Sequence, residues 1–233
     1  MPLGRTAAVA AKHPLRVSAA TWTLRPARCI AIEWPVARRR GQGTLGLLWN
    51  DTAAHGPSSG ILKKGFLMHI RPEQPNDSAA IEVVTIAAFA QAPHSDQTEH
   101  FIVRALRAAG VLAVSLVAEE GGKVVGHVAV SPVQISDGTP GWYGLGPISV
   151  VPERQGQGVG TQLMHAALQA LRALGARGCV VLGDPAFYGR LGFVAEPALQ
   201  YPGVSPMYFQ ALAWGAPLPR GTVAYHAAFA AQG

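Results

Sequence analysis

The sequence is poor in cysteine, in long apolar runs and in clusters of metal ligands. Its 233 residues include two cysteines, Cys29 and Cys179, which are too few for a disulfide framework. No apolar run reaches the roughly 20 residues that a membrane-spanning helix needs, and no Cys/His cluster has the spacing of a zinc site. Hydrophobic residues make up 49% of the chain, which excludes wholesale disorder. We therefore expect a cytoplasmic globular protein with neither a metal nor a membrane partner.

Acidic residues are scarce in the first part of the chain. Residues 1–67 hold ten lysines and arginines against two acidic residues, a net charge of +8. Residues 68–233 hold nine basic and eleven acidic residues, a net charge of −2. The overall charge of +6 therefore describes neither part, and we expect two regions of different character.

No helical or alternating apolar period persists through residues 1–67, and prolines interrupt the segment repeatedly. We expect a basic, poorly structured N-terminal extension without a function of its own. Three interpretations stay open: a transit peptide, a nucleic-acid contact through the run Arg38-Arg39-Arg40, or a true start at Met68 that makes the extension non-native. Aromatic residues are not regularly interleaved with the arginines, so nucleic acid is not the expected partner.

From residue 68 onward, strand and helix patterns alternate. We expect strands at residues 68–71, 115–120, 123–135, 142–151, 179–182, 193–196 and 207–213, and helices at residues 79–90, 96–109, 160–174 and 185–191. The turn Gly121-Gly122 between two alternating runs predicts a β-hairpin. Together these elements predict one α/β domain over residues 68–233, long enough to bury a core of its own.

A glycine-rich segment separates the strand at 142–151 from the helix that follows. It reads Gln155-Gly156-Gln157-Gly158-Val159-Gly160-Thr161. Glycines let successive backbone N–H groups turn toward one point ahead of a helix N-terminus, which suits a phosphate or pyrophosphate. No lysine follows in Walker spacing, and the glycines do not have dinucleotide-binding spacing, so both of those nucleotide sites are disfavoured. The alternative is a flexible turn that binds nothing.

At Gln155, Gly158 and Gly160 the sequence resembles the GNAT acetyltransferases, whose Q-x-x-G-x-G element lies between a strand and a helix. Residues 186–193 resemble the family's second marker, a short helix that carries a tyrosine, here Tyr188, and ends in Leu-Gly-Phe. The resemblance covers residues 68–233. It implies the GNAT fold, a mixed, mostly antiparallel central sheet flanked by helices.

Three further segments are similar to the YhbS-like subgroup of that family: residues 125–128, 180–185 and 221–225. The resemblance implies an acetyl-CoA-dependent N-acetyltransferase, in which an amine attacks the thioester directly. It assigns the pyrophosphate to the backbone N–H groups of residues 155–161. It lays the pantetheine arm along Ile148, Ser149 and Val150 like an added strand, and it places Asp184 where the family often has asparagine at the pantetheine amide.

The resemblance also implies catalytic roles. Tyr188 is the expected general acid for the leaving thiolate, and the backbone N–H of Val150 is expected to meet the carbonyl oxygen. An alkylamine with a pKa near 10.4 is neutral in roughly one molecule in a few thousand at pH 7, so a base must take its proton. The central strand has no carboxylate, unlike that of many relatives. His127 is the candidate base and Glu119 and Glu120 are weaker ones. The alternative for both Tyr188 and His127 is a purely structural role.

A second function class stays open, a non-catalytic GNAT-like module that binds CoA or an acyl carrier. The acceptor is expected to be a small-molecule or peptide amine of unknown identity. The sequence leaves both a monomer and a homodimer open.

Overall fold

The centre of the fold is a seven-stranded sheet in the order β1-β2-β3-β5-β6-β9-β7. We describe it from a computed structural model that covers residues 68–93, 95–215 and 217–233, so the expectations for residues 1–67 lie outside the described residues. Only β5 and β6 pair in parallel; the other neighbours are antiparallel. The strands are β1 (His69–Pro72), β2 (Val114–Glu120), β3 (Lys123–Pro132), β5 (Trp142–Val150), β6 (Gly178–Leu182), β7 (Val194–Ala195) and β9 (Phe209–Ala213).

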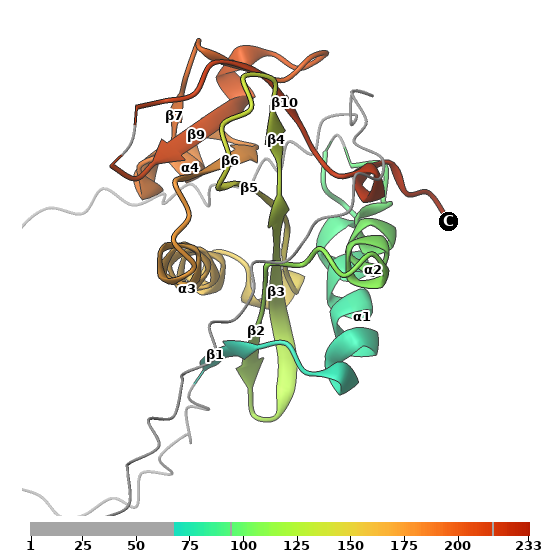
Figure 1. Cartoon of the computed structure of the whole chain (residues 1–233). Coiled ribbons are helices and arrows are strands. Elements are labelled where there is room, and N and C mark those ends of the chain that lie inside the picture. Colours follow the sequence, from blue (N-terminus) through green and yellow to red (C-terminus); the bar gives the residue numbers. More distant parts are fainter. Residues whose placement is uncertain (1–67, 94, 216) are drawn as a thin grey trace, which may run out of the picture.

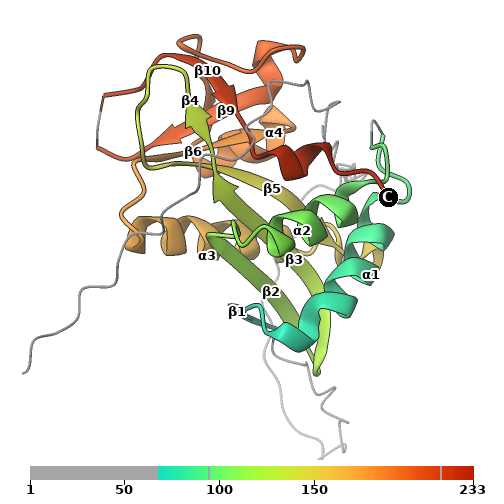
Figure 2. The ribbon, with the colours of Figure 1, turned by 45° about the vertical axis from the view of Figure 1, so that its right-hand side comes forward.

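Helices cover both faces of this sheet (Figures 1 and 2). The helix α3 (Val159–Ala173) lies on one face, and α1 (Ser78–Phe89) and α2 (Glu99–Ala108) lie on the other. A one-turn helix, α4 (Pro185–Tyr188), follows β6. The expected mixed, mostly antiparallel sheet with flanking helices is confirmed, because only one of the six strand pairs is parallel.

The core under α3 is made by one face of that helix. Leu163, Met164 and Leu171 recur at helical spacing and are fully buried against the sheet. They pack on Val128 and Val150, which lie on the two central strands β3 and β5. The helix is therefore anchored to the strand that precedes it, and this anchoring holds the glycine-rich segment between them in place.

The expectation of a single strand over residues 123–135 is wrong in one respect. The segment divides into β3 and a two-residue strand, β4 (Gln134–Ile135), at the Pro132 end of β3. The strand β4 belongs to a second, three-stranded sheet with β10 (Gly221–Ala224) and β8 (Leu199–Gln200), which the sequence patterns did not predict. These two- to four-residue strands are too short to show an alternating period.

The other elements agree with the sequence within a few residues, including the predicted hairpin of β2 and β3. Within the described ranges, no helix combines the length and apolarity that crossing a membrane requires.

Replacing Leu163 by alanine is expected to lower the free energy of unfolding by about 2–5 kcal/mol, because its side chain is 0% exposed and a cavity would remain. Chemical denaturation measures the difference. The matched control is Leu174→Ala at the end of the same helix, where the leucine is 56% exposed and the expected loss is under about 1 kcal/mol. Equal losses in the two variants would contradict the described packing of α3.

Candidate active site

The strands β5 and β6 pair over only part of their length. Their register runs from Trp142 opposite Gly178 to Leu145 opposite Val181 and stops there. The rest of β5 stays paired with β3 as far as Val150 opposite Gly126. The second half of β5 therefore has one open edge, facing the space between it and β6. This open edge leaves the unpaired backbone that the added strand implied by the GNAT resemblance needs.

Hydrogen-bond alternation decides which backbone groups line the open edge. Just beyond β5, Val151 donates its N–H to the carbonyl of Val125 at 3.0 Å. In an antiparallel pair such bonded positions recur at every second residue, so Ser149 bonds β3 through its opposite residue, His127. Ile148 and Val150 instead turn their N–H and C=O groups away from β3. These two residues can pair with an extended ligand as with an added strand.

The glycine-rich loop joins this edge to α3. The side chain of Gln155 donates to the Val150 carbonyl at 2.9 Å, which ties the loop to the end of β5. Gly156 and Gly158 have φ values of +70° and +85°, a left-handed conformation that favours glycine. Gly158 is the N-cap of α3 and provides no side-chain cap, so the first N–H groups of the helix, those of Val159, Gly160 and Thr161, have no intrahelical acceptor.

The arrangement of these N–H groups meets the chemical requirement of an anion site. Glycine-rich backbone and a helix N-terminus together present several donors and the positive end of the helix dipole. The loop begins where the open edge of β5 ends. A ligand that joins an extended polar arm to a pyrophosphate can therefore place the arm along the open edge of β5 and the pyrophosphate at the loop.

Tyr188 is the last residue of α4, the one-turn helix that follows β6. Its ring packs on Gly183, where a Cβ would lie 2.3 Å from the Tyr188 Cε2 atom, so this ring position requires glycine there. Phe187 and Phe193 contact the ring edge-on, and the residue is 2% exposed. Burial raises the pKa of the Tyr188 phenol well above its ordinary value, and Cys179 and Asp184 raise it further. The phenol therefore keeps its proton at neutral pH and is a donor.

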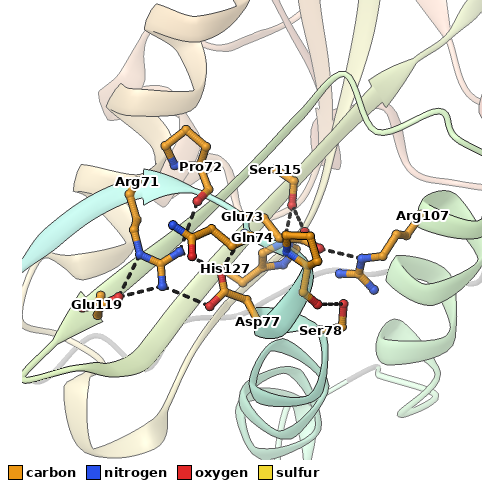
Figure 3. Close-up of polar contacts among 11 residues, drawn as sticks. Arg71, Pro72, Glu73, Gln74, Asp77, Ser78, Arg107, Ser115, Glu119 and His127 are labelled. Atoms are coloured by element: carbon orange, nitrogen blue, oxygen red, sulfur yellow. Dashed lines mark hydrogen bonds and ion pairs between the residues drawn. The ribbon is translucent and has the colours of Figure 1, made fainter.

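His127 lies on the opposite face of the sheet from α3, fully buried beneath α1 and α2 (Figure 3). Its Nε2 is 2.8 Å from the Ser115 hydroxyl and 3.7 Å from Oε2 of Glu73. The Ser115 hydroxyl donates to the same Glu73 oxygen, and Arg107 donates its Nε–H to the other Glu73 oxygen at 2.6 Å. Burial lowers the pKa of His127 below 6.5, and Glu73 partly opposes that shift. The imidazole is therefore neutral at pH 7.

Glu73 carries the negative charge of this buried group. Burial alone raises the pKa of its carboxyl, but contacts with His127, Arg107 and Ser115 outweigh it and lower the pKa from 4.5 to about 2. Sequence analysis found His127 but missed Glu73, Ser115 and Arg107. Polar residues at 73 and 115 lie among strand positions without a recognisable motif, and only the pairing of β1, β2 and β3 brings them together.

The remaining predicted residues have other contacts. Ser149 is 1% exposed and its hydroxyl bonds Thr85 of α1 at 3.2 Å. The carboxylate of Asp184 accepts the N–H of Ala186 at 2.8 Å and so caps α4. Glu119 and Glu120 form ion pairs with arginines, each at 2.6 Å.

A cavity of about 390 Å³ lies on the hairpin side of the loop, between the β2–β3 turn and residues 151–154. The cavity is lined by residues of β2, β3, the turn between them and residues 151–154, whereas the open edge of β5 faces β6. The cavity and the open edge are therefore separate. Among the described residues, no group of three or more His, Cys, Asp or Glu side chains is placed to hold a metal ion.

Comparisons with known proteins agree with this geometry. Residues 112–195, which span β3, β5, the loop, α3 and α4, match the family described as "Acetyltransferase (GNAT) domain". Over 127 residues the chain is 37% identical to the uncharacterized N-acetyltransferase YhbS of Escherichia coli K12, covering 54% of this chain and 73% of that protein.

Two solved structures are also similar. A GNAT family acetyltransferase from Brucella melitensis, crystallised in complex with acetyl-CoA, shares 54% identity at a TM-score of 0.64, over 70% of this chain and 99% of that one. Escherichia coli YhbS in complex with CoA shares 31% identity at a TM-score of 0.65, over 78% of this chain and 98% of that one.

The ionised state of Glu73 predicts a pH dependence of stability. Its pKa is lower in the folded than in the unfolded chain, so its contribution is complete above about pH 5 and is lost as the pH falls toward 2. The difference in unfolding free energy between the wild type and Glu73→Gln is therefore expected to shrink over that range, by at most about 3 kcal/mol. Denaturant titrations at several pH values measure it. The control is Glu153→Gln, at an exposed position outside this group of contacts. The same change with pH in both variants would contradict the assignment to Glu73.

Proposed function

The chain belongs to the GNAT family of N-acetyltransferases, and from that premise we propose that it transfers an acetyl group from acetyl-CoA to an amine by direct attack. The observation that carries the proposal is the open edge of β5, which leads directly into the left-handed glycines ahead of α3. The relatives crystallised with acetyl-CoA and with CoA support the choice of cofactor.

In this proposal the cofactor binds in two parts. The pantetheine arm pairs with the N–H and C=O groups of Ile148 and with the Val150 carbonyl, which also accepts from Gln155. The Val150 N–H is kept for the acetyl carbonyl, and Ser149 holds β5 to β3. The pyrophosphate accepts N–H groups from the loop and the first turn of α3, that is, from Gln155, Gly156, Gln157, Gly158, Val159, Gly160 and Thr161. Asp184 contributes by capping α4, which fixes the helix that carries Tyr188.

The proposed roles of the residues follow from the charges that form during the transfer, on the carbonyl oxygen, the leaving thiolate and the amine nitrogen. As the amine nitrogen bonds to the carbonyl carbon, negative charge develops on the carbonyl oxygen, and the N–H of Val150 stabilises it. When the C–S bond breaks, Tyr188 donates its proton to the thiolate. The amine must lose a proton, and His127 is the base that we propose, since its neutral imidazole can accept one.

Acetylation of amines is tested by incubating the full chain with acetyl-CoA and a panel of primary alkylamines, antibiotic amines, lysine peptides and peptide N-termini. Released CoA thiol and a mass gain of one acetyl group on an acceptor are expected. Binding of acetyl-CoA without turnover on any of them would favour the non-catalytic module instead.

Gly158→Ala is expected to weaken acetyl-CoA binding about tenfold, because a Cβ strains the left-handed backbone that aims the N–H groups. Calorimetric titration measures the affinity. Gly175→Ala is the matched control, because Gly175 has a φ of +75° and open space around a Cβ, but lies past the other end of α3. Both variants lose stability through the same strain, and only the first is expected to lose affinity. Equal affinities would remove the loop from the binding site.

Tyr188→Phe is expected to lower kcat about a hundredfold, the size of effect typical of a lost general acid. Its acetyl-CoA affinity is expected to stay within about twofold, since the ring and its packing remain. Steady-state kinetics with the best acceptor of the panel give both values. Tyr208→Phe, which removes a hydroxyl from the turn before β9, serves as the control with unchanged kcat. An unchanged kcat in Tyr188→Phe would end its role as the acid.

A further inference from the structure

A short 3₁₀ helix, η2 (Pro152–Arg154), connects β5 to the glycine-rich loop, and its position decides where that loop begins. Just before it, the N–H of Val151 bonds the Val125 carbonyl and ends the pairing with β3. Within η2, the N–H of Arg154 bonds the carbonyl of Val151 at 2.9 Å. This bond shapes the turn but does not attach it to another element.

Little packing attaches η2 to the neighbouring hairpin of β2 and β3. The cavity of about 390 Å³ lies between the two, and residues of both line it. Pro152 and Glu153 are exposed to solvent. The position of η2 therefore depends on polar contacts more than on buried apolar side chains.

An ion pair joins η2 to the hairpin at this cavity. Nε of Arg154 donates to Oε2 of Glu120 at 2.6 Å, and both residues line the cavity. Glu120 is the last residue of β2 and pairs with Lys123 across a two-residue turn, so the hairpin fixes its backbone. The ion pair therefore connects η2 to a fixed point of the central sheet.

A second contact links η2 to the glycines of the loop. The side chain of Gln157 donates to the carbonyl of Glu153 at 2.7 Å. Gln157 lies between Gly156 and Gly158, the two left-handed residues that direct the N–H groups of the loop. A displacement of η2 would therefore displace the donors that an anion needs.

We propose that Glu120 and Arg154 are positioning residues for the cofactor, which hold η2 so that the glycine-rich loop has its binding conformation before acetyl-CoA arrives. A loop that is ordered in advance loses less conformational entropy on binding, which raises affinity without a contact to the ligand. The inference rests on the function proposed above. The side chain of Arg154 is 39% exposed, so solvent weakens the pair and its loss is expected to change affinity by a small factor.

A direct contact of Arg154 with the pyrophosphate is the competing role, and Glu120→Gln separates the two. This variant removes a negative charge near an anion site and frees the guanidinium, so a direct contact predicts tighter binding of acetyl-CoA. Positioning predicts the opposite, a Kd about threefold higher in calorimetric titration of the full chain. Unchanged or tighter binding in Glu120→Gln would overturn the proposal.

Glu119→Gln is the matched control for this measurement. It removes the same charge from the preceding residue and breaks a 2.6 Å pair with Arg71, which does not involve η2. Its affinity for acetyl-CoA is expected to equal that of the wild type. An equal loss of affinity in Glu119→Gln and Glu120→Gln would assign the effect to the sheet in general and would contradict the proposal.

Arg154→Gln completes a double-mutant cycle with Glu120→Gln. Each single variant is expected to raise the KM for acetyl-CoA about threefold and to leave kcat within about twofold, because the pair acts on cofactor binding and not on the transfer. The double variant is expected to match the single ones, since all three lack the same contact. Arg154→Lys, which keeps the charge, is expected to recover part of the affinity. Single effects that multiply to about ninefold in the double variant would show independent roles and overturn the proposal.

Hydrogen exchange of the full chain without ligand tests the pair separately from the proposed function. The amide of Arg154 bonds Val151, and the amide of Gln155 bonds the Pro152 carbonyl at 3.2 Å. In Glu120→Gln both amides are expected to exchange several-fold faster, while the amide of Val151, which bonds β3, keeps its rate. Equal rates at the first two amides in variant and wild type would overturn the proposal. A wild type that does not bind acetyl-CoA would instead refute the proposed function, whatever the exchange rates show.

Discussion

The candidate site depends on one constraint: β5 must keep its pairing with β3 while it loses its pairing with β6. Hydrogen bonds of β5 to β3 continue to the end of the strand, and the buried face of α3 packs on both strands. These interactions hold β5 in place after β6 has separated from it at Leu145. Without that support, unpaired backbone groups inside a fold would be costly. With it, they are preorganised donors and acceptors for a ligand.

The two faces of the sheet carry different parts of the chemistry. The face under α3 is apolar and joins the loop to the strand. The face under α1 and α2 contains polar side chains, among them the fully buried His127 and the half-buried Glu73 and Ser115. Buried polar side chains are stable when they satisfy one another, and in this group two atoms, Nδ1 of His127 and Nη2 of Arg107, have no hydrogen-bond partner among the described residues.

The parts of the site that are local in sequence were predictable. The loop from Gln155 to Thr161, the helix after it and the tyrosine in its short helix all lie within about 35 residues and follow recognisable patterns. The group around His127 was not predictable, because its hydrogen bonds join residues 12, 34 and 42 positions apart. Strand register decides these contacts, and the sequence patterns predict strands without their register. The division of the expected strand at residues 123–135 was missed because its last two residues pair with a distant segment.

The central claim is that acetyl-CoA pairs with the open edge of β5 and with the loop that follows it. Hydrogen exchange of individual amides in the full chain, with and without saturating acetyl-CoA, tests this directly. The account predicts slower exchange at Ile148, at Val150 and through Gly156 to Thr161, with no change at Ser149, whose N–H already bonds β3. Bound acetyl-CoA that leaves the amides of Ile148 and Val150 unchanged would contradict it.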